Sequence, residues 1–319
     1  MAHVVRTAGA SRDAERRGVE AGTTVAVASS PSPIERGERT MSSATHQRRI
    51  RRPIRLALAL MGAAALAAAS VALPASAEDA AQQPADPKPT VVLVHGAFAD
   101  SSGWNDVTER LQKQGYTVIA ASNPLRGLTS DAEYVKTILS TLTGLIVLVG
   151  HSYGGAVITN AATGNPNVTS LVYVAAYALD AGERLIDANE LGGGHSDLAD
   201  HLVIRPYPGA PEGDADGYID PAFFRDLFAG DLPKKQTAVM AASQRPAALS
   251  ALFTPSGEPA WKTIPSWYVV ASQDHTIPPE AERVMAERAG ATTVEIDSSH
   301  VVMMSHPDEV TEVILDAAE

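Results

Sequence analysis

Residues 150–154 read Gly-His-Ser-Tyr-Gly, a G-x-S-x-G pattern that lies between an apolar run (145–149) and a helix-like run (156–162). A serine on a sharp strand-to-helix turn needs glycine two positions before and after it, because a side chain at either site would collide with the adjoining strand or helix. Such a turn lifts the hydroxyl clear of the sheet edge, beside the free amides of a helix N-terminus. The pattern therefore predicts that Ser152 is a nucleophile.

A serine nucleophile needs a base and an acid, and two later strands offer them. The β-branched and aromatic run 266–271 predicts a strand, and Asp274 follows it. Residues 292–296 predict another strand, and His300 follows that one. The carboxyl ends of parallel strands share one edge of a sheet, so we expect these side chains to meet Ser152 there. In this interpretation His300 takes the serine proton, and Asp274 holds the imidazole in one tautomer.

Other residues compete for these roles. Asp180 follows the predicted strand 171–176 and is an alternative acid, while Asp274 itself could be a helix N-cap. His275 is adjacent to the expected acid, and His306 precedes the proline that starts the last helix. His151, inside the serine turn, and His95 are expected to be structural.

Two backbone amides are predicted to stabilise the oxyanion that forms when the serine attacks a carbonyl. One is the amide of Tyr153, and the other is that of Ala97, which follows the predicted strand 90–94. Gly96 lets the backbone of this loop come close to the nucleophile.

The alternation of apolar strands and amphipathic helices predicts an α/β fold with a mostly parallel sheet of about six strands and flanking helices. The predicted strands are 90–94, 116–120, 145–149, 171–176, 266–271 and 292–296, and the predicted helices include 102–114, 131–141 and 280–289. Residues from about 180 to 263 break this alternation and are expected to form a helical cap, with helical pieces at 221–229 and 235–243. The expected substrate pocket is lined by Gly96, Phe98, Phe223, Phe224, Phe228 and Val301. Half or more of the apolar cap residues could instead only pack the cap on the core.

The N-terminal residues have a different character. Residues 1–40 are expected to be a disordered or non-native extension, because they contain few large apolar residues. Residues 41–77 combine a basic block, an alanine- and leucine-rich apolar run and an A-x-A site, which predicts a signal peptide cleaved near Ala77. Residues 78–88 are then a linker, and residues 89–319 are the catalytic domain. The chain is accordingly expected to be secreted, in the periplasm or outside the cell.

Charge and composition limit the possible partners. Residues 1–77 hold 11 of the 25 basic residues and 5 of the 37 acidic ones, so the remaining chain has a formal charge of −18. Such a surface disfavours nucleic acid and stable membrane association after signal cleavage, and favours a small neutral substrate. The chain has no cysteine, and no phosphate-binding glycine motif follows a strand. No cofactor or metal is therefore expected, and the oligomeric state stays open.

Three motifs together resemble the α/β-hydrolase superfamily: V-H-G-A-F at 94–98, G-H-S-Y-G at 150–154, and S-Q-D-H with S-S-H-V-V-M-M at 272–275 and 298–304. The resemblance covers the chain from residue 89 onwards and is strongest to small serine carboxylesterases of the methylesterase and hydroxynitrile lyase branch. Lyases of that branch carry threonine and lysine where this chain has Gly96 and Val301. The resemblance therefore implies a Ser-His-Asp esterase. Together with the predicted leader and the acidic surface, it leads us to expect a secreted enzyme that acts on small neutral esters. A carbon–carbon lyase and a catalytically slow ligand-binding protein are the alternatives.

Overall fold

The computed structural model of the chain describes residues 87–319. The predicted extension (1–40), the predicted signal peptide (41–77) and all but the last two residues of the predicted linker (78–88) lie outside these residues. Within the described part, no helix is both long and apolar enough to span a membrane.

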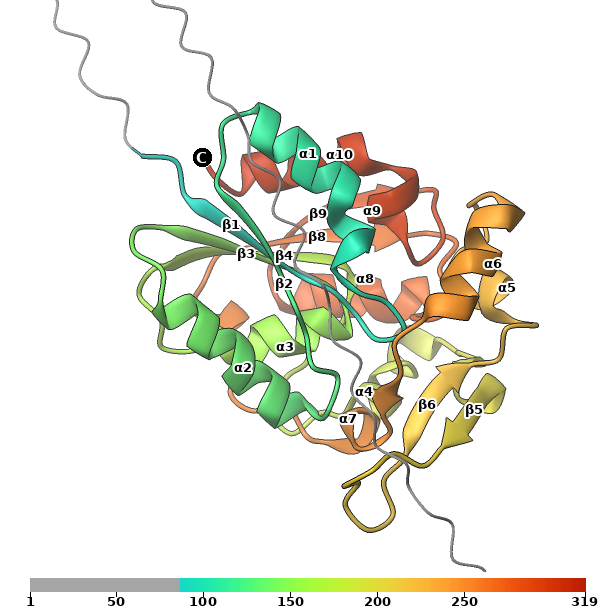
Figure 1. Cartoon of the computed structure of the whole chain (residues 1–319). Helices are drawn as coiled ribbons and strands as arrows, with labels where there is room; N and C mark the ends of the chain where they lie inside the picture. Colours follow the sequence, from blue (N-terminus) through green and yellow to red (C-terminus); the bar gives the residue numbers. More distant parts are fainter. Residues whose placement is uncertain (1–86) are drawn as a thin grey trace, which may run out of the picture. The chain divides into compact units, whose positions relative to one another are not determined.

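A six-stranded, wholly parallel sheet forms the centre of the fold, with the strand order β2-β1-β3-β4-β8-β9 (Figure 1). Its strands are β1 (Thr90–Val94), β2 (Val118–Ala121), β3 (Ile146–Ser152), β4 (Val168–Ala176), β8 (Ser266–Ala271) and β9 (Thr292–Ile296). The central strand β3 is buried along its whole length, as expected for a parallel strand covered on both faces. The sheet confirms the predicted number of strands and their mostly parallel arrangement.

Helices cover both faces of the sheet (Figure 1). One face carries α1 (Asn105–Lys113), α9 (Val302–Ser305) and α10 (Pro307–Asp316), and the other carries α2 (Leu128–Ser140), α3 (Tyr153–Ala161) and α8 (Pro279–Arg288). Both α8 and α10 begin with proline, whose missing N–H is not needed in the first helical turn. A short 3₁₀ helix, η1 (Ser101–Trp104), leads into α1, and its Trp104 is fully buried.

The segment between β4 and β8 forms the cap, and it is not only helical as predicted. It contains a three-stranded antiparallel sheet of β5 (Leu202–Arg205), β6 (Asp216–Ile219) and β7 (Ala247–Ala248). Its helices are α4 (Leu185–Ala188), α5 (Phe224–Phe228), α6 (Lys234–Ser243) and α7 (Ser250–Phe253), with 3₁₀ turns η2 (Leu191–Gly193), η3 (Leu198–His201) and η4 (Ala260–Lys262). The sequence gives little indication of β6, because this strand begins with Asp-Gly and both residue types are disfavoured in strands.

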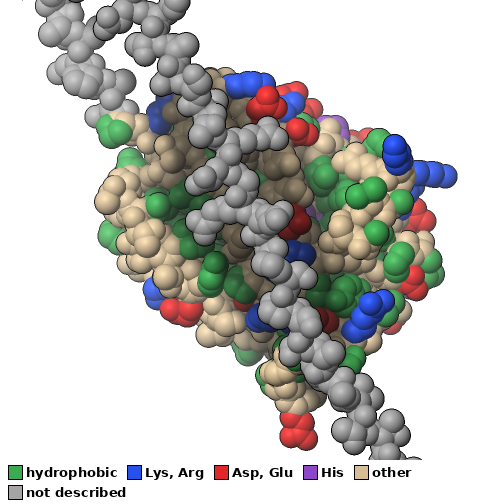
Figure 2. All heavy atoms as spheres, viewed as in Figure 1, with side chains coloured by type: hydrophobic (Ala, Val, Ile, Leu, Met, Phe, Trp, Pro, Cys, Tyr) green, Lys and Arg blue, Asp and Glu red, His purple; other side chains and the backbone are tan. Residues whose placement is uncertain are grey.

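The surface around the cap is mixed in character. Figure 2 shows apolar side chains on the α5–α6 side of this face, among polar and charged ones. Two of the exposed large apolar residues, Phe223 and Val239, belong to this region.

Candidate active site

The structure places Ser152 on the turn that joins β3 directly to α3, with no loop residue between them. Its backbone has φ 55° and ψ −126°, a left-handed conformation that non-glycine residues rarely adopt. Strain of this kind is concentrated at functional sites and needs support from its surroundings. The residue is 4% exposed, so the serine lies beneath the surface at the carboxyl edge of the sheet.

The glycines of the turn allow this backbone to pass between its neighbours. A Cβ added at Gly150 would lie 2.6 Å from the carbonyl oxygen of Gly154 in α3. One added at Gly154 would lie 2.5 Å from the carbonyl oxygen of Val94 in β1. Both positions therefore require glycine, which confirms the collisions predicted from the sequence.

Asp274 and His300 are in direct contact, although 26 residues separate them. His300 Nδ1 lies 2.5 Å from Asp274 Oδ2, and both side chains are buried. The other carboxylate oxygen, Oδ1, accepts hydrogen bonds from the amides of Thr276 (2.6 Å) and Ile277 (2.9 Å). Because the carboxylate accepts the Nδ1 proton, the neutral ring presents Nε2 as an acceptor. Nε2 is buried and has no hydrogen-bond partner among the described residues.

His151 links this pair to the serine turn. Its Nε2 lies 2.9 Å from the carbonyl oxygen of His300, and the two rings are 4.7 Å apart. That carbonyl can only accept, so Nε2 carries the proton and Nδ1 does not. Burial and the neighbouring His300 lower the pKa of His151 well below its ordinary value, so the ring stays neutral. Since His151 directly precedes Ser152, this hydrogen bond holds the backbone of His300 beside the serine turn.

The loop after β1 passes directly beside the serine. A Cβ added at Gly96 would lie 2.6 Å from the Cβ of Ser152, so the loop that carries Ala97 lies next to the nucleophile. Among the described residues, no backbone carbonyl accepts a hydrogen bond from the Ala97 amide. The Tyr153 amide is the first N–H of α3 and has no partner within the helix. Both predicted oxyanion donors are thus on elements that adjoin Ser152.

The competing residues lie in other surroundings. Asp180 forms an ion pair with Lys262 at 2.8 Å, and its side chain is 42% exposed. His275 is exposed, and His306 Nδ1 lies 3.4 Å from Glu309 at the start of α10. His95 is fully buried, and burial lowers its pKa.

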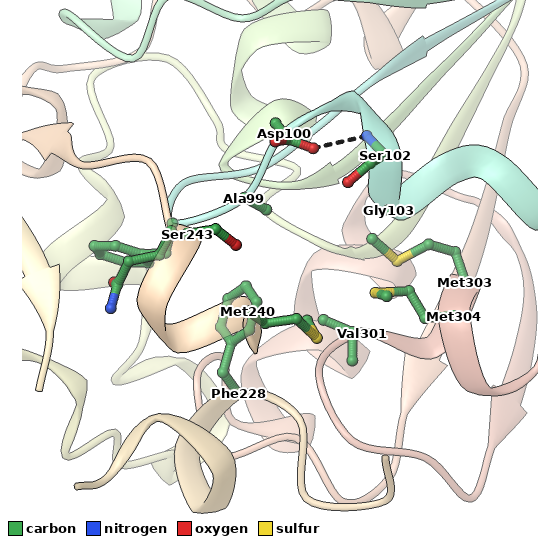
Figure 3. Close-up of a pocket in the computed structure, with 12 residues that line it drawn as sticks. Ala99, Asp100, Ser102, Gly103, Phe228, Met240, Ser243, Val301, Met303 and Met304 are labelled. Carbon is green, nitrogen blue, oxygen red and sulfur yellow. Dashed lines mark hydrogen bonds between the residues drawn. The ribbon is translucent and has the colours of Figure 1, made fainter. Parts of the chain in front are cut away.

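A small cavity of about 60 Å³ lies next to His300, between the cap and the loops that follow β1 and β9 (Figure 3). Of the predicted pocket residues, Phe98, Phe228 and Val301 line it. Phe228 also packs against the His300 ring, with 5.0 Å between ring centroids. Residues of the loops and helices around the site complete the lining: Ala99, Asp100, Ser102, Gly103, Met240, Ser243, Gln244, Met303 and Met304.

Three predicted pocket residues lie elsewhere. Phe223 is 41% exposed and stacks on His201 at 3.8 Å, and Phe224 is buried against Phe228. Gly96 adjoins Ser152 but does not line the cavity. A five-residue helix gives no periodicity from which the inward face of α5 could be read, so the sequence did not separate these phenylalanines. Sequence reasoning also left out Gly103 and Ser243, for which no local signal exists.

Comparison with known proteins relates this chain to one family. Residues 91–313 match the model of the alpha/beta hydrolase family. The chain is 25% identical over 254 residues to alpha/beta hydrolase nvfD of Aspergillus novofumigatus, covering 72% of this chain and 97% of the relative. It is 25% identical over 260 residues to methylesterase 17 of Arabidopsis thaliana, covering 74% of this chain and 94% of that protein.

Solved structures share the same fold. The crystal structure of polyneuridine aldehyde esterase superposes with a TM-score of 0.64 at 21% identity, covering 73% of this chain and all of that one. The methylesterase protein MES16 from Arabidopsis gives a TM-score of 0.60 at 20% identity, covering 72% of this chain and 98% of the other.

Proposed function

The chain belongs to the alpha/beta hydrolase family and, like the esterases and methylesterases it resembles, is a carboxylic ester hydrolase; we propose that it cleaves small neutral esters through Ser152, His300 and Asp274. The observation that carries this proposal is the buried Asp274–His300 pair with a free Nε2, whose backbone carbonyl is bonded to His151, the residue before Ser152. This is the arrangement that a serine needs to become a nucleophile at neutral pH.

In the proposed reaction, His300 Nε2 takes the proton of the Ser152 hydroxyl as its oxygen attacks the ester carbonyl carbon. The carbonyl oxygen becomes an oxyanion and accepts hydrogen bonds from the Ala97 and Tyr153 amides, each contributing about 2.7–4 kcal/mol at sites of this kind. The intermediate collapses to an acyl-enzyme, and the alcohol leaves with the proton from His300. Water then attacks the acyl-enzyme by the same route, which releases the acid and restores Ser152.

The cavity supports a small substrate. One water molecule needs at least about 10–15 Å³ of such space, so a cavity of about 60 Å³ accommodates a group of only a few heavy atoms. Most of the side chains around it are apolar, and Met303 and Met304 adapt easily to different shapes. We therefore expect a short, uncharged acyl or alcohol group to occupy it.

The test is the turnover of p-nitrophenyl esters of increasing acyl length by the wild type and by Ser152→Ala. We expect the variant to lose hydrolysis while keeping the wild-type melting temperature, and the wild type to prefer short chains. Retained turnover by Ser152→Ala would remove this serine from the mechanism. Cleavage of a cyanohydrin without ester hydrolysis would favour the lyase. Labelling of Ser152 by a fluorophosphonate without turnover of any ester would favour the ligand-binding protein.

We also propose that the chain is exported and cleaved after Ala77, because the basic block, apolar run and A-x-A site have the order of a secretory signal. N-terminal sequencing of protein from the culture fluid or periplasm is expected to start at Glu78. A variant with Ala75→Gln and Ala77→Gln is expected to keep its leader. Recovery of uncleaved wild-type protein inside the cell would contradict the proposal.

A further inference from the structure

The segment that leads from β2 into the first turn of α2, residues 123–131, contacts the loop that carries Ala97 and the start of α3, where Tyr153 lies. At its start, the Asn123 amide donates to His95 Nε2 at 3.0 Å, and the Asn123 side chain donates to the His95 carbonyl at 3.1 Å. Since Nε2 accepts, His95 Nδ1 carries the proton and donates to the carbonyl of Gly96 at 2.9 Å. These bonds fix the loop immediately before Ala97.

At its other end, the segment holds Tyr153. The Tyr153 hydroxyl donates to Asp131 Oδ2 at 2.7 Å, and Asp131 is fully buried. The Arg126 amide donates to both oxygens of the same carboxylate, at 3.1 and 3.0 Å. Burial and the Asp131 carboxylate raise the pKa of Tyr153 well above its ordinary value, so its hydroxyl remains a donor. The ring of Tyr153, the residue proposed to supply the second oxyanion amide, is thus tied to the segment.

The middle of the segment is fastened to the cap. Arg126 Nη1 lies 2.8 Å from Asp216 of β6, and Nη2 donates to the carbonyl of Pro246 at 3.1 Å. The Ala248 amide of β7 donates to the carbonyl of Leu125 at 3.0 Å. Leu125 has φ 61°, a left-handed conformation that a branched side chain rarely adopts, so the contacts on both sides hold it there.

We infer that residues 123–131 form a positioning segment that sets both oxyanion donors and couples their placement to the docking of the cap. This inference rests on the proposed esterase function. Asp131 and Arg126 are positioning residues, since they act through Tyr153 and the cap. Donors to the oxyanion act only when the carbonyl oxygen becomes charged, and catalytic groups must be held within about 0.5 Å of their productive place. Loosening the segment therefore lowers kcat more than it raises KM.

The first test is Tyr153→Phe, which removes the hydroxyl bound to Asp131 and keeps the backbone amide. The matched control is Tyr173→Phe, which removes another buried tyrosine hydroxyl. Tyr173 lies on the neighbouring strand β4, and its hydroxyl is 2.8 Å from Oγ1 of Thr159 in α3. Both variants are expected to melt about 2–4 °C below the wild type. Only Tyr153→Phe is expected to lower kcat, by about 10-fold and by less than the 10²–10³-fold loss that follows deletion of a whole donor, with KM within twofold.

A second variant tests the link to the cap, and it remains a test of the segment if Tyr153→Phe folds poorly. Arg126→Gln removes the guanidinium contacts with Asp216 and Pro246, while its amide still bonds to Asp131. We expect kcat to fall by several-fold. The loss in the double variant with Tyr153→Phe is expected to be smaller than the product of the two single losses, because both act on one linkage. Multiplied losses would show that the cap and the donor are independent, which would overturn the coupling.

Failure of this inference can be told apart from failure of the proposed function. An active wild type with equal kcat in Tyr153→Phe and Tyr173→Phe overturns the positioning role and leaves the esterase in place. A wild type that turns over no ester, and whose Ser152 a fluorophosphonate does not label, overturns the proposed function and this inference with it.

Discussion

Replacing Glu282 by glutamine is expected to change how the stability of the fold depends on pH. Glu282 lies on α8 and is fully buried against the end of β8. Its Oε2 accepts the Ala271 amide at 3.1 Å, whereas Oε1 has no partner among the described residues. Burial, and then the neighbouring Asp274 carboxylate, raise the pKa of Glu282 well above its ordinary value. The folded protein thus keeps this acid protonated at a pH where the unfolded chain has released the proton.

The sign and size of the effect follow from this difference. Between the ordinary pKa of glutamate and the raised pKa in the fold, the folded state binds one proton more than the unfolded state. Rising pH therefore lowers the free energy of unfolding, by about 1.4 kcal/mol per pH unit from this group. Glutamine is neutral in both states and keeps an oxygen for the Ala271 amide. The free energy of unfolding of Glu282→Gln, relative to that of the wild type, should grow by about 1.4 kcal/mol per pH unit above the ordinary pKa of glutamate.

The assay is urea unfolding followed by circular dichroism at pH 5, 6, 7 and 8. Glu280→Gln is the control, because Glu280 is an exposed glutamate on the same helix. The control curve is expected to stay parallel to that of the wild type. Equal pH slopes for Glu282→Gln and the wild type would refute the reasoning, because they would mean that Glu282 titrates alike in the folded and unfolded states.

Three further predictions concern the site and its supports. Asp274→Asn is expected to lower kcat by about 10³–10⁴-fold in ester hydrolysis with the fold retained, because the histidine loses the acceptor that fixes its tautomer; a loss below tenfold would contradict this role. Gly154→Ala puts a Cβ 2.5 Å from a strand carbonyl and is expected to destabilise the fold by about 3 kcal/mol. Gly230→Ala, whose Cβ would meet no atom nearer than 3.9 Å, is the control in urea unfolding, and equal midpoints would disagree with the packing argument. His151 is buried and neutral because its pKa is lowered. Below about pH 6.5 the unfolded state therefore binds more protons than the folded state. The free energy of unfolding then falls with falling pH, by up to about 1.4 kcal/mol per pH unit from this group. The comparison is made in proteins that also carry Glu282→Gln, because this change removes the opposite contribution. In that background, His151→Gln should reduce the slope of the free energy of unfolding against pH, and an unchanged slope would argue against a neutral ring.

The core of the fold could be predicted closely because its signals are local. Strands β1, β8 and β9 have the predicted bounds, since each is a short β-rich run bounded by residues that end strands. The helix α3 begins directly after Ser152, as the glycine-flanked turn requires. The order of Ser152, Asp274 and His300 along the chain, with each residue at or soon after the end of a strand, could be read in the same way.

The cap could not be predicted to the same degree, because its structure depends on distant partners. The strand β6 contains Asp216 and Gly217, and it pairs with Ala247 and Ala248 some 30 residues away. Nothing within either segment indicates this pairing. The orientation of α5 is likewise decided by how the cap docks, which turns Phe228 toward the cavity and Phe223 toward solvent.

The buried acids around the site show the same limit. Asp131 and Glu282 belong to helices and read as ordinary polar positions in the sequence. Each acquires its role from a group brought close by the fold, Tyr153 for Asp131 and Asp274 for Glu282. A carboxylate that is buried only in the folded chain leaves no mark in the periodicity of its own helix.

The strand order also separates the proposed triad along the chain. The neighbours β2, β1, β3 and β4 all lie within residues 90–176, so this part of the sheet carries Ser152. The strands β8 and β9 complete one edge of the sheet, and Asp274 and His300 follow them. A truncated chain that stops before β8 would therefore keep the proposed nucleophile and lack both of its proposed partners.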